Sequence, residues 1–166
     1  QQSDRRLEFI KKIVDKCDKN TLLLFHTIEY GKKILDKLSK EIPDKDFYYI
    51  DGEISGKRRE EIKKEMEKTD GKVKVLIASY GTLSTGVSIN AIFNVIFADS
   101  FKSEQIVIQS IGRALRKHHQ KDVANIFDLV DVFSSEMNNI LYNHFKEREK
   151  FYKKRKYPYK VIKVNL

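Results

Sequence analysis

Short apolar runs that alternate with amphipathic stretches are the feature that most constrains the fold of this chain. The runs begin at Thr21, Phe47, Val73, Phe93 and Val123, and polar residues bound each of them. Strands that are apolar along almost their whole length are buried on both faces, as in a parallel sheet. Helix–strand alternation supplies the helices that cover such a sheet. The sequence therefore predicts an α/β domain with a mainly parallel sheet and helices on both faces.

The stretches between these runs carry the spacing and the end signals of helices. Their apolar residues recur at intervals of three and four, so they share one helix face. Ser55 has the residue type and position of an N-cap, and Pro43 stands where a preceding helix should end. Helices are expected over residues 4–18, 29–41, 55–68 and 103–117 and from Ser134 onward, and residues 161–166 are compatible with an edge strand.

The charge of the chain favours an anionic partner. A net charge of +9 over 166 residues most often indicates a protein that binds nucleic acid, and the alternative is a merely soluble cationic protein. Residues 146–163 hold nine Lys/Arg against two Glu, with Tyr152, Tyr157 and Tyr159 among them. Such cations can neutralise phosphates and such rings can stack on bases, whereas the alternative is a solvated helix face. We therefore expect one domain over residues 1–133 and a basic helical extension over residues 134–166, packed on or continuing it.

Several classes of protein are disfavoured by what the chain lacks. Cys17 is its one cysteine, so a disulfide framework is impossible and an intracellular, cytoplasmic location is expected. No metal site is expected. No apolar run approaches the roughly 20 residues that span a bilayer, and the first residues are not a signal peptide. The chain does not begin with Met, which indicates a processed product or a piece of a longer protein.

The stretch DGEISGKRR, from Asp51, looks like a phosphate-binding loop but fails as one. A P-loop has four residues between its glycines and Ser or Thr after its lysine. Here Gly52 and Gly56 enclose three residues, and Arg58 follows Lys57. Acidic D-E-x-H and D-E-A-D motifs are also absent. The interpretation as a complete small P-loop enzyme is therefore disfavoured.

Four stretches occur in the order of the motifs of superfamily 2 helicases. QSIGRALRK places Arg113 and Arg116 on one face of an expected helix and resembles motif VI. LLLFHTIEYGKKIL, from Leu22, resembles motif IV, and YIDGEISGKRREEI, from Tyr49, resembles the segment that begins with the family's H-G or D-G pair. VLIASYGTLSTGVSI, from Val75, resembles motif V. The chain is thus similar to the C-terminal RecA-like domain of these helicases, a three-layer α/β/α fold, and its details are closest to phage UvsW-type recombination helicases.

The resemblance implies a site shared with ATP. Motif VI arginines reach across an interdomain cleft to ATP bound by the other RecA-like domain, so Arg116 is expected to be the arginine finger and Arg113 its partner. Gln109 is expected to orient one arginine or the attacking water. Gly86 and Ser88 of motif V are expected near the nucleotide, although Ser88 stands where many relatives have an aspartate. The alternative is that both arginines form surface salt bridges on an exposed helix.

The resemblance also implies contacts with DNA. The motif IV turn and the motif V loop are expected to meet the nucleic-acid backbone, since small polar residues let a phosphate approach closely. An ordinary connector and a satisfied loop histidine are the alternatives. The residues expected from these motifs to bind nucleic acid are His26, Thr27, Gly52, Ser79, Thr82 and Thr85. The basic composition of the tail adds Lys153, Lys154, Arg155 and Lys156.

The expected function is that of the second motor domain of an ATP-dependent DNA helicase or translocase. ATP with Mg²⁺ would be bound mainly by a preceding N-terminal RecA-like domain, so this chain alone is expected to be inactive as an ATPase. The resemblance implies branch migration, fork regression and R-loop unwinding in DNA recombination and repair. Its partners would be branched, duplex or single-stranded DNA and the RNA of R-loops, in the host cytoplasm if the chain is phage-encoded. The rival interpretation is a non-catalytic nucleic-acid-binding module.

Overall fold

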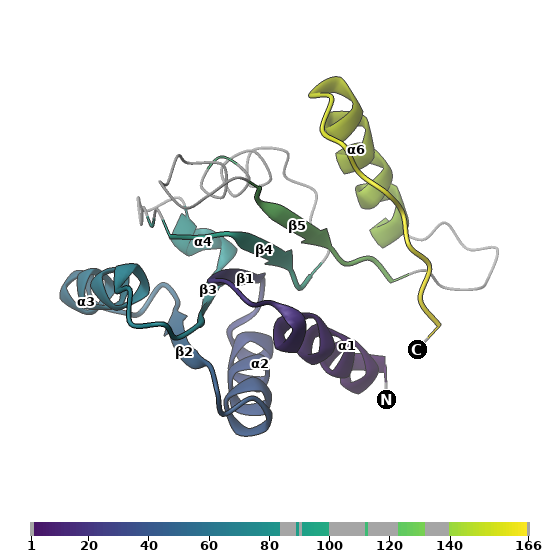
Figure 1. Cartoon of the computed structure of the whole chain (residues 1–166). Coiled ribbons are helices and arrows are strands. Elements are labelled where there is room, and N and C mark those ends of the chain that lie inside the picture. Colours follow the sequence, from purple (N-terminus) through teal and green to yellow (C-terminus); the bar gives the residue numbers. More distant parts are fainter. Residues whose placement is uncertain are drawn as a thin grey trace.

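The computed structural model describes residues 2–83, 89, 91–99, 112, 123–131 and 140–165. Its strands form one sheet in the order β2-β3-β1-β4-β5, and every neighbouring pair is parallel (Figure 1). The strands are β1 (Thr21–Phe25), β2 (Asp46–Ile50), β3 (Lys74–Ser79), β4 (Asn94–Phe97) and β5 (Asn125–Asp128). The described helices are α1 (Gln2–Lys16), α2 (Ile28–Glu41), α3 (Gly56–Glu67), α4 (Tyr80–Leu83) and α6 (Ile140–Lys154). The predicted parallel sheet is therefore confirmed.

The central strand β1 shows why the sheet is covered on both faces. Every residue of β1 is buried, and the strand lies between β3 and β4. Successive side chains of a strand point to opposite faces. Leu22 and Leu24 accordingly enter one hydrophobic cluster, whereas Leu23 and Phe25 enter the other. A strand with this pattern needs helices on both sides, as the sequence predicted.

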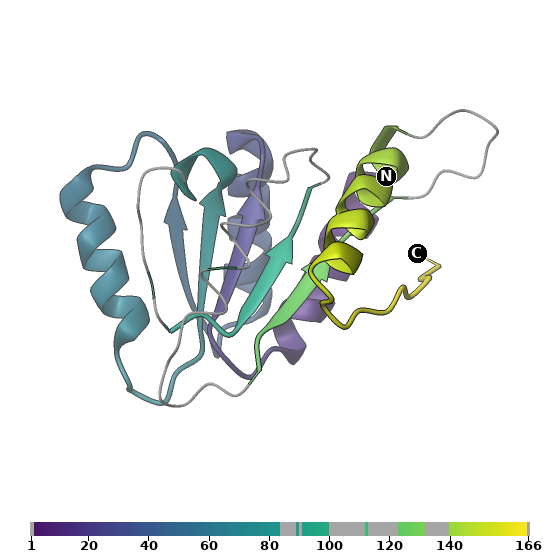
Figure 2. The same ribbon diagram turned by 90° about the horizontal axis from the view of Figure 1, so that it is seen from above.

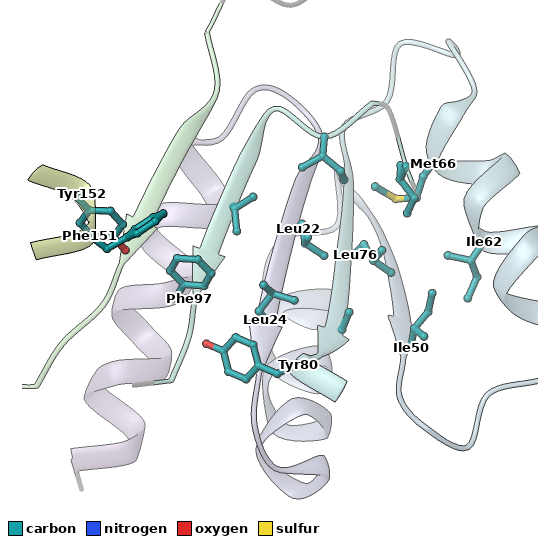
Figure 3. Packing of buried hydrophobic residues seen from close by; sticks show 14 residues of the cluster. Leu22, Leu24, Ile50, Ile62, Met66, Leu76, Tyr80, Phe97, Phe151 and Tyr152 are labelled. Atoms are coloured by element: carbon teal, nitrogen blue, oxygen red, sulfur yellow. The ribbon is translucent and has the colours of Figure 1, made fainter. Parts of the chain in front are cut away.

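Each face of the sheet has its own layer of helices (Figures 1 and 2). Helices α1 and α2 cover one face, with Ile10 and Ile34 in the cluster that they share with the sheet. Helices α3 and α6 contribute to the cluster on the other face. Figure 3 shows Met66 of α3 and Phe151 of α6 at opposite ends of this cluster. The result is the three-layer α/β/α arrangement of RecA-like domains.

Helix α2 approaches β1 closely at Gly31. A Cβ atom on Gly31 would lie 2.5 Å from ring carbons of Phe25. That ring in turn stacks on Tyr49 of β2, with ring centroids 5.5 Å apart. Packing therefore requires a residue without a side chain at this position, and the contact fixes α2 over the end of β1.

Helix α6 is joined to the end of β5 by a buried ion pair. Arg148, which is 2% exposed, donates from Nε to Oδ2 of Asp128 at 2.7 Å and from Nη2 to Oδ1 at 2.8 Å. The Tyr152 hydroxyl donates to the same Oδ2 at 2.9 Å. Burial, with the Asp128 carboxylate adding to it, raises the pKa of Tyr152. We call these three side chains the α6 clamp. Because Tyr152 is part of it, the expectation that this ring could stack on bases is wrong.

Part of the predicted helical content lies outside the described residues. Only Gly112 is described from the helix expected over residues 103–117, and it is helical. Helix α6 starts at Ile140, and residues 132–139, which include the expected start at Ser134, lie outside the described residues.

The edge strand proposed for the C-terminal stretch is wrong for residues 161–165, which form no strand. Lys156 has a φ of 55°, so the chain turns at the end of α6. Beyond this turn Val161 and Ile162 are 59% and 67% exposed. These residues bury too little apolar surface to hold a strand on the sheet.

Candidate nucleotide and nucleic-acid interface

The carboxyl ends of four strands meet at one edge of the sheet. Phe25, the last residue of β1, pairs with Ser79, the last residue of β3, and strands β2 and β4 end within one residue of that level. The turns after these strands therefore lie at a common edge, which we call the carboxyl edge. Ligands of open parallel sheets bind outside such an edge. The predicted site residues that the structure brings to it are His26, Thr27, Gly52, Ser79 and Thr82.

The turn after β1 presents His26 and Thr27, and both residues are exposed. Thr27 is the N-cap residue of α2, and its side chain makes no capping hydrogen bond. The first N–H groups of a helix have no partner within the helix and attract anions. The His26 ring lies 6.4 Å from the Tyr80 ring, centroid to centroid, in a tilted arrangement. This turn thus offers polar groups of the kind that meet a phosphate.

The turn after β2 is held by its own side chains. Asp51 is buried, and its Oδ1 accepts the N–H of Glu53 at 2.9 Å. Arg59 of α3 donates from Nη2 to the carbonyl oxygens of Asp51 at 3.1 Å and Gly52 at 3.4 Å. Ser55 caps α3 by accepting the N–H of Arg58 at 3.2 Å, which confirms the predicted cap. Gly52 is thus exposed in a turn that these hydrogen bonds hold in place.

The segment after β3 differs from the open loop that the sequence suggested. The chain passes directly from Ser79 into the short helix α4. Thr82 is 3% exposed, and its hydroxyl lies 2.6 Å from the Ser79 hydroxyl. The expectation of an open loop is therefore wrong at Thr82, because a helical turn folds this side chain inward onto the strand end. Ser79 remains half-buried at the carboxyl edge.

Asp99 follows β4 and contacts two of the other turns. Its Oδ2 accepts the main-chain N–H of His26 at 2.8 Å, and its main-chain oxygen accepts the Tyr80 hydroxyl at 2.9 Å. Burial raises the pKa of Asp99 above its ordinary value, and the His26 N–H and Arg6 only partly oppose this shift. Asp99 was not among the predicted site residues, although an acidic residue two positions after a buried strand was a usable signal.

Arg6 of α1 reinforces the ends of β4 and β5. It donates from Nε to the Ala98 carbonyl at 2.7 Å and from Nη2 to the Leu129 carbonyl at 3.0 Å. Its Nη1 lies 2.6 Å from Asp131 Oδ2. Arg6 is buried, whereas the neighbouring Arg5 is exposed. The sequence of one amphipathic helix held no signal that could distinguish these two arginines.

The exposed cations Lys153, Lys154, Arg155 and Lys156, which we call the basic quartet, lie at the end of α6. Helix α6 runs back alongside β5, so the quartet lies on the β5 flank of the sheet (Figure 2). Lys153 is 3.6 Å from Glu149, and Arg155 lies over the Phe151 ring at 5.6 Å. In the part of the chain that the structure describes, no hydrogen bond or ion pair joins the quartet to the predicted site residues of the carboxyl edge.

The remaining predicted site residues lie outside the described residues. They are the nucleotide-facing Gly86, Ser88, Gln109, Arg113 and Arg116 and the DNA-facing Thr85. Their roles therefore remain predictions.

The fold and the order of segments along the carboxyl edge define a helicase motor domain. Residues 5–118 match the family described as the helicase conserved C-terminal domain. This match covers more than half of the chain, and the chain therefore belongs to that family.

Among known proteins, the chain is similar to the ATP-dependent DNA helicase uvsW of Enterobacteria phage T4. The two are 35% identical over 176 residues, which cover 98% of this chain and 34% of the phage protein. The crystal structure of T4 UvsW superimposes with a TM-score of 0.67 at 30% identity, over 90% of this chain and 32% of that one. This chain thus spans about a third of the length of its phage relative.

More distant structures share the fold alone. The C-terminal part of the Fun30 ATPase domain has a TM-score of 0.69 at 18% identity, over 86% of this chain and 44% of that one. The C-terminal domain of the DEAD-box protein Dbp5 has a TM-score of 0.66 at 15% identity, over 90% of this chain and 78% of that one. None of the described helices is long and apolar enough to cross a membrane.

Proposed function

We propose that this chain is the second motor domain of an ATP-dependent DNA helicase or translocase that acts on branched DNA. The observation that carries the proposal is the convergence of three motif-like turns on the carboxyl edge of a RecA-like sheet, in a chain 35% identical to an ATP-dependent DNA helicase. Branch migration, fork regression and R-loop unwinding are the activities proposed, as part of DNA recombination and repair.

The nucleotide would be shared with a preceding RecA-like domain. Within the described residues, no group of three or more His, Cys, Asp or Glu side chains could hold a metal ion. The sequence also has no P-loop. ATP and its Mg²⁺ would therefore be held mainly by the other domain. Arg116 would place a guanidinium at the γ-phosphate as its charge develops, an effect on the order of 10³–10⁵ in rate for arginine fingers. Arg113 and Gln109 would assist it, and Gly86 and Ser88 would line the nucleotide.

DNA would be held at the carboxyl edge by contacts that carry no sequence information. His26, Thr27 and the first turn of α2 would meet a phosphate, and the turns at Gly52 and Ser79 lie along the same edge. Thr82 would act by supporting Ser79 from within. The basic quartet, on the flank of the domain, would supply a second contact with duplex or branched DNA.

Arg116→Ala in the full-length enzyme tests the catalytic proposal. DNA-stimulated ATPase should be nearly abolished, while nucleotide and DNA affinities stay close to those of the parent, because the finger acts mainly on charge that appears in the transition state. Arg116→Lys should not restore turnover, since an ammonium lacks the planar fork of a guanidinium. Arg5→Ala, at an exposed arginine of α1, is the matched control and should keep normal turnover.

Two outcomes would contradict the proposal at different levels. Near-normal turnover of Arg116→Ala would mean that this arginine does not act on ATP. A full-length parent that binds DNA but shows no DNA-stimulated ATPase would favour the non-catalytic nucleic-acid-binding module instead.

A further inference from the structure

Three turns of the carboxyl edge converge on Asp99. Its carboxylate accepts the main-chain N–H of His26 after β1, and its main-chain oxygen accepts the hydroxyl of Tyr80 after β3. Asp99 itself follows β4. Asp99 thus connects the ends of three parallel strands, and its hydrogen bonds to His26 and Tyr80 are additional to those of the sheet.

The start of α2 depends on this link because it lacks a side-chain cap. Thr27 occupies the N-cap position with extended backbone geometry, and its hydroxyl accepts no first-turn N–H. The residue before it, His26, is held by the Asp99 carboxylate at 2.8 Å. Asp99 therefore fixes the direction in which the chain enters α2.

The carboxylate is a poor stabiliser of the fold. His26 is exposed, so water can replace the half-buried Asp99 carboxylate as acceptor of this N–H at little cost in stability. Arg6, a buried cation whose charge lowers the pKa of Asp99, directs its donors to Ala98, Leu129 and Asp131 instead. Among the residues that the structure describes, no ion pair involves Asp99. Burial also raises the pKa of Asp99. A carboxylate whose burial is only partly compensated by the His26 N–H and Arg6 is explained better by the geometry that it imposes than by the stability that it adds.

We propose that Asp99 is a positioning residue that holds His26 and Thr27 in the orientation in which they meet a nucleic-acid phosphate. Tyr80 holds Asp99 in turn and so ties this orientation to the turn after β3, where Ser79 lies. The inference rests on the proposed function, because it requires that the turn after β1 contacts DNA.

The test measures, in the full-length enzyme, the concentration of a single-stranded oligonucleotide that gives half-maximal ATPase, together with kcat and the unfolding midpoint. Asp99→Ala should raise the half-maximal concentration about tenfold, roughly the effect of losing one hydrogen bond that orders a binding group. The value of kcat at saturating DNA should change much less, and the unfolding midpoint should stay within a few degrees of that of the parent.

Asp99→Asn is the conservative variant. Its amide oxygen can still accept the His26 N–H, and the negative charge near the proposed phosphate is gone. This variant should bind the oligonucleotide at least as tightly as the parent. Asp36→Ala, at an exposed carboxylate of α2 away from the carboxyl edge, controls for the loss of one charge and should change nothing.

A background with His26→Ala and Thr27→Ala separates the inference from the proposed function. This double variant alone should raise the half-maximal concentration, and adding Asp99→Ala to it should have less than a twofold further effect. If the double variant binds DNA normally, the contact at this turn fails, and the inference fails with it. If the double variant weakens binding but Asp99→Ala does not, or if Asp99→Ala has its full effect in both backgrounds, the inference alone is overturned. A large fall in the unfolding midpoint with unchanged DNA dependence would also overturn it, since Asp99 would then be merely structural.

Discussion

Removing Arg148 from the α6 clamp should destabilise the domain strongly. Arg148→Met would leave the Asp128 carboxylate, whose side chain is 10% exposed, without its bidentate partner. Breaking a buried pair by removing one member costs about 3–5 kcal/mol. For a chain of this size that cost corresponds to a fall in Tm of roughly 6–20 °C. Tyr152→Phe removes only the hydroxyl that donates at 2.9 Å. A hydrogen bond to a charged group contributes about 1.5–3 kcal/mol, so this fall should be about half as large.

A double variant shows whether the cost arises from an unpaired charge. Arg148→Met with Asp128→Leu removes both charges and replaces them with apolar side chains, which is often neutral in stability. Its Tm should therefore lie well above that of Arg148→Met alone. Lys150→Met is the matched control, because Lys150 pairs with Glu147 at 2.8 Å on the exposed face of the same helix. It should unfold with the parent, since surface pairs contribute little.

Calorimetry of the 166-residue chain and its variants measures these differences. The reasoning is refuted if Arg148→Met unfolds within a degree or two of Lys150→Met. It is also refuted if the double variant is no more stable than Arg148→Met. Either result would mean that the apolar contacts of Phe151, rather than the ion pair, hold α6 on the sheet.

Four further predictions follow from the same structure. The isolated 166-residue chain should hydrolyse no ATP, with or without DNA, because its sequence has no P-loop; DNA-stimulated turnover that survives a contamination control would contradict the two-domain proposal. Reversing the basic quartet to Glu should weaken DNA binding by the full-length enzyme and lower the slope of log K against log salt by roughly 0.9 for each duplex phosphate that the protein no longer neutralises. Fluorescence anisotropy would measure this. The charge-matched control reverses four exposed lysines of α1, α2 and α3 near the amino ends of the strands, namely Lys12, Lys16, Lys40 and Lys64. Gly31→Ala should destabilise the chain by about 1–3 kcal/mol through overpacking against Phe25, although alanine normally favours a helix; Gly56→Ala, whose new methyl meets nothing within 4 Å, is the control, and equal effects in denaturant titrations would refute the packing argument. The pKa of Asp99 is raised above its ordinary value of 3.8, so its carboxyl group binds a proton more tightly in the folded chain than in the unfolded chain. Ionised Asp99 therefore lowers stability at neutral pH, and this cost disappears as the pH falls through the folded-state pKa. Asp99→Asn should thus have a higher Tm than the parent at pH 7, with the gap closing toward pH 4, and a gap that is constant with pH would contradict this assignment.

The parallel sheet could be predicted because its signal is distributed along the chain. Each strand is apolar over most of its length, and the burial of Leu22, Leu23, Leu24 and Phe25 on alternating faces follows from this pattern alone. The cap at Ser55 was predictable for the same reason, since a helix start is a local feature. The edge strand that the sequence allowed for residues 161–166 is wrong for residues 161–165, because β-propensity says nothing about whether a sheet edge is available. The chain turns at Lys156 and leaves Val161 and Ile162 exposed to solvent.

The carboxyl edge was only partly predictable because its geometry depends on residues far apart in sequence. The turns at His26, Gly52 and Ser79 were found through motif order, which fixes residue identity but not exposure. Thr82 shows the limit, since its motif position suggested an accessible hydroxyl and the structure pairs it inward with Ser79. Arg6 reaches Leu129 across 123 positions of sequence, and no local pattern could indicate that contact.

Asp128 and Asp99 lie at or just beyond the ends of the neighbouring strands β5 and β4, and they differ in how far their charge is compensated. Asp128, at the end of β5, receives two donors from Arg148 and one from Tyr152, so its charge is fully matched and it anchors α6. Asp99, just beyond β4, receives the main-chain N–H of His26, and its pKa is raised because this N–H and Arg6 only partly compensate its burial. A chain selected for stability alone would gain from a neutral residue at position 99. Asn at this position would keep an acceptor for the His26 N–H without the charge, so Asp99→Asn and Asp99→Ala together separate the orientation of His26 from the effect of the charge.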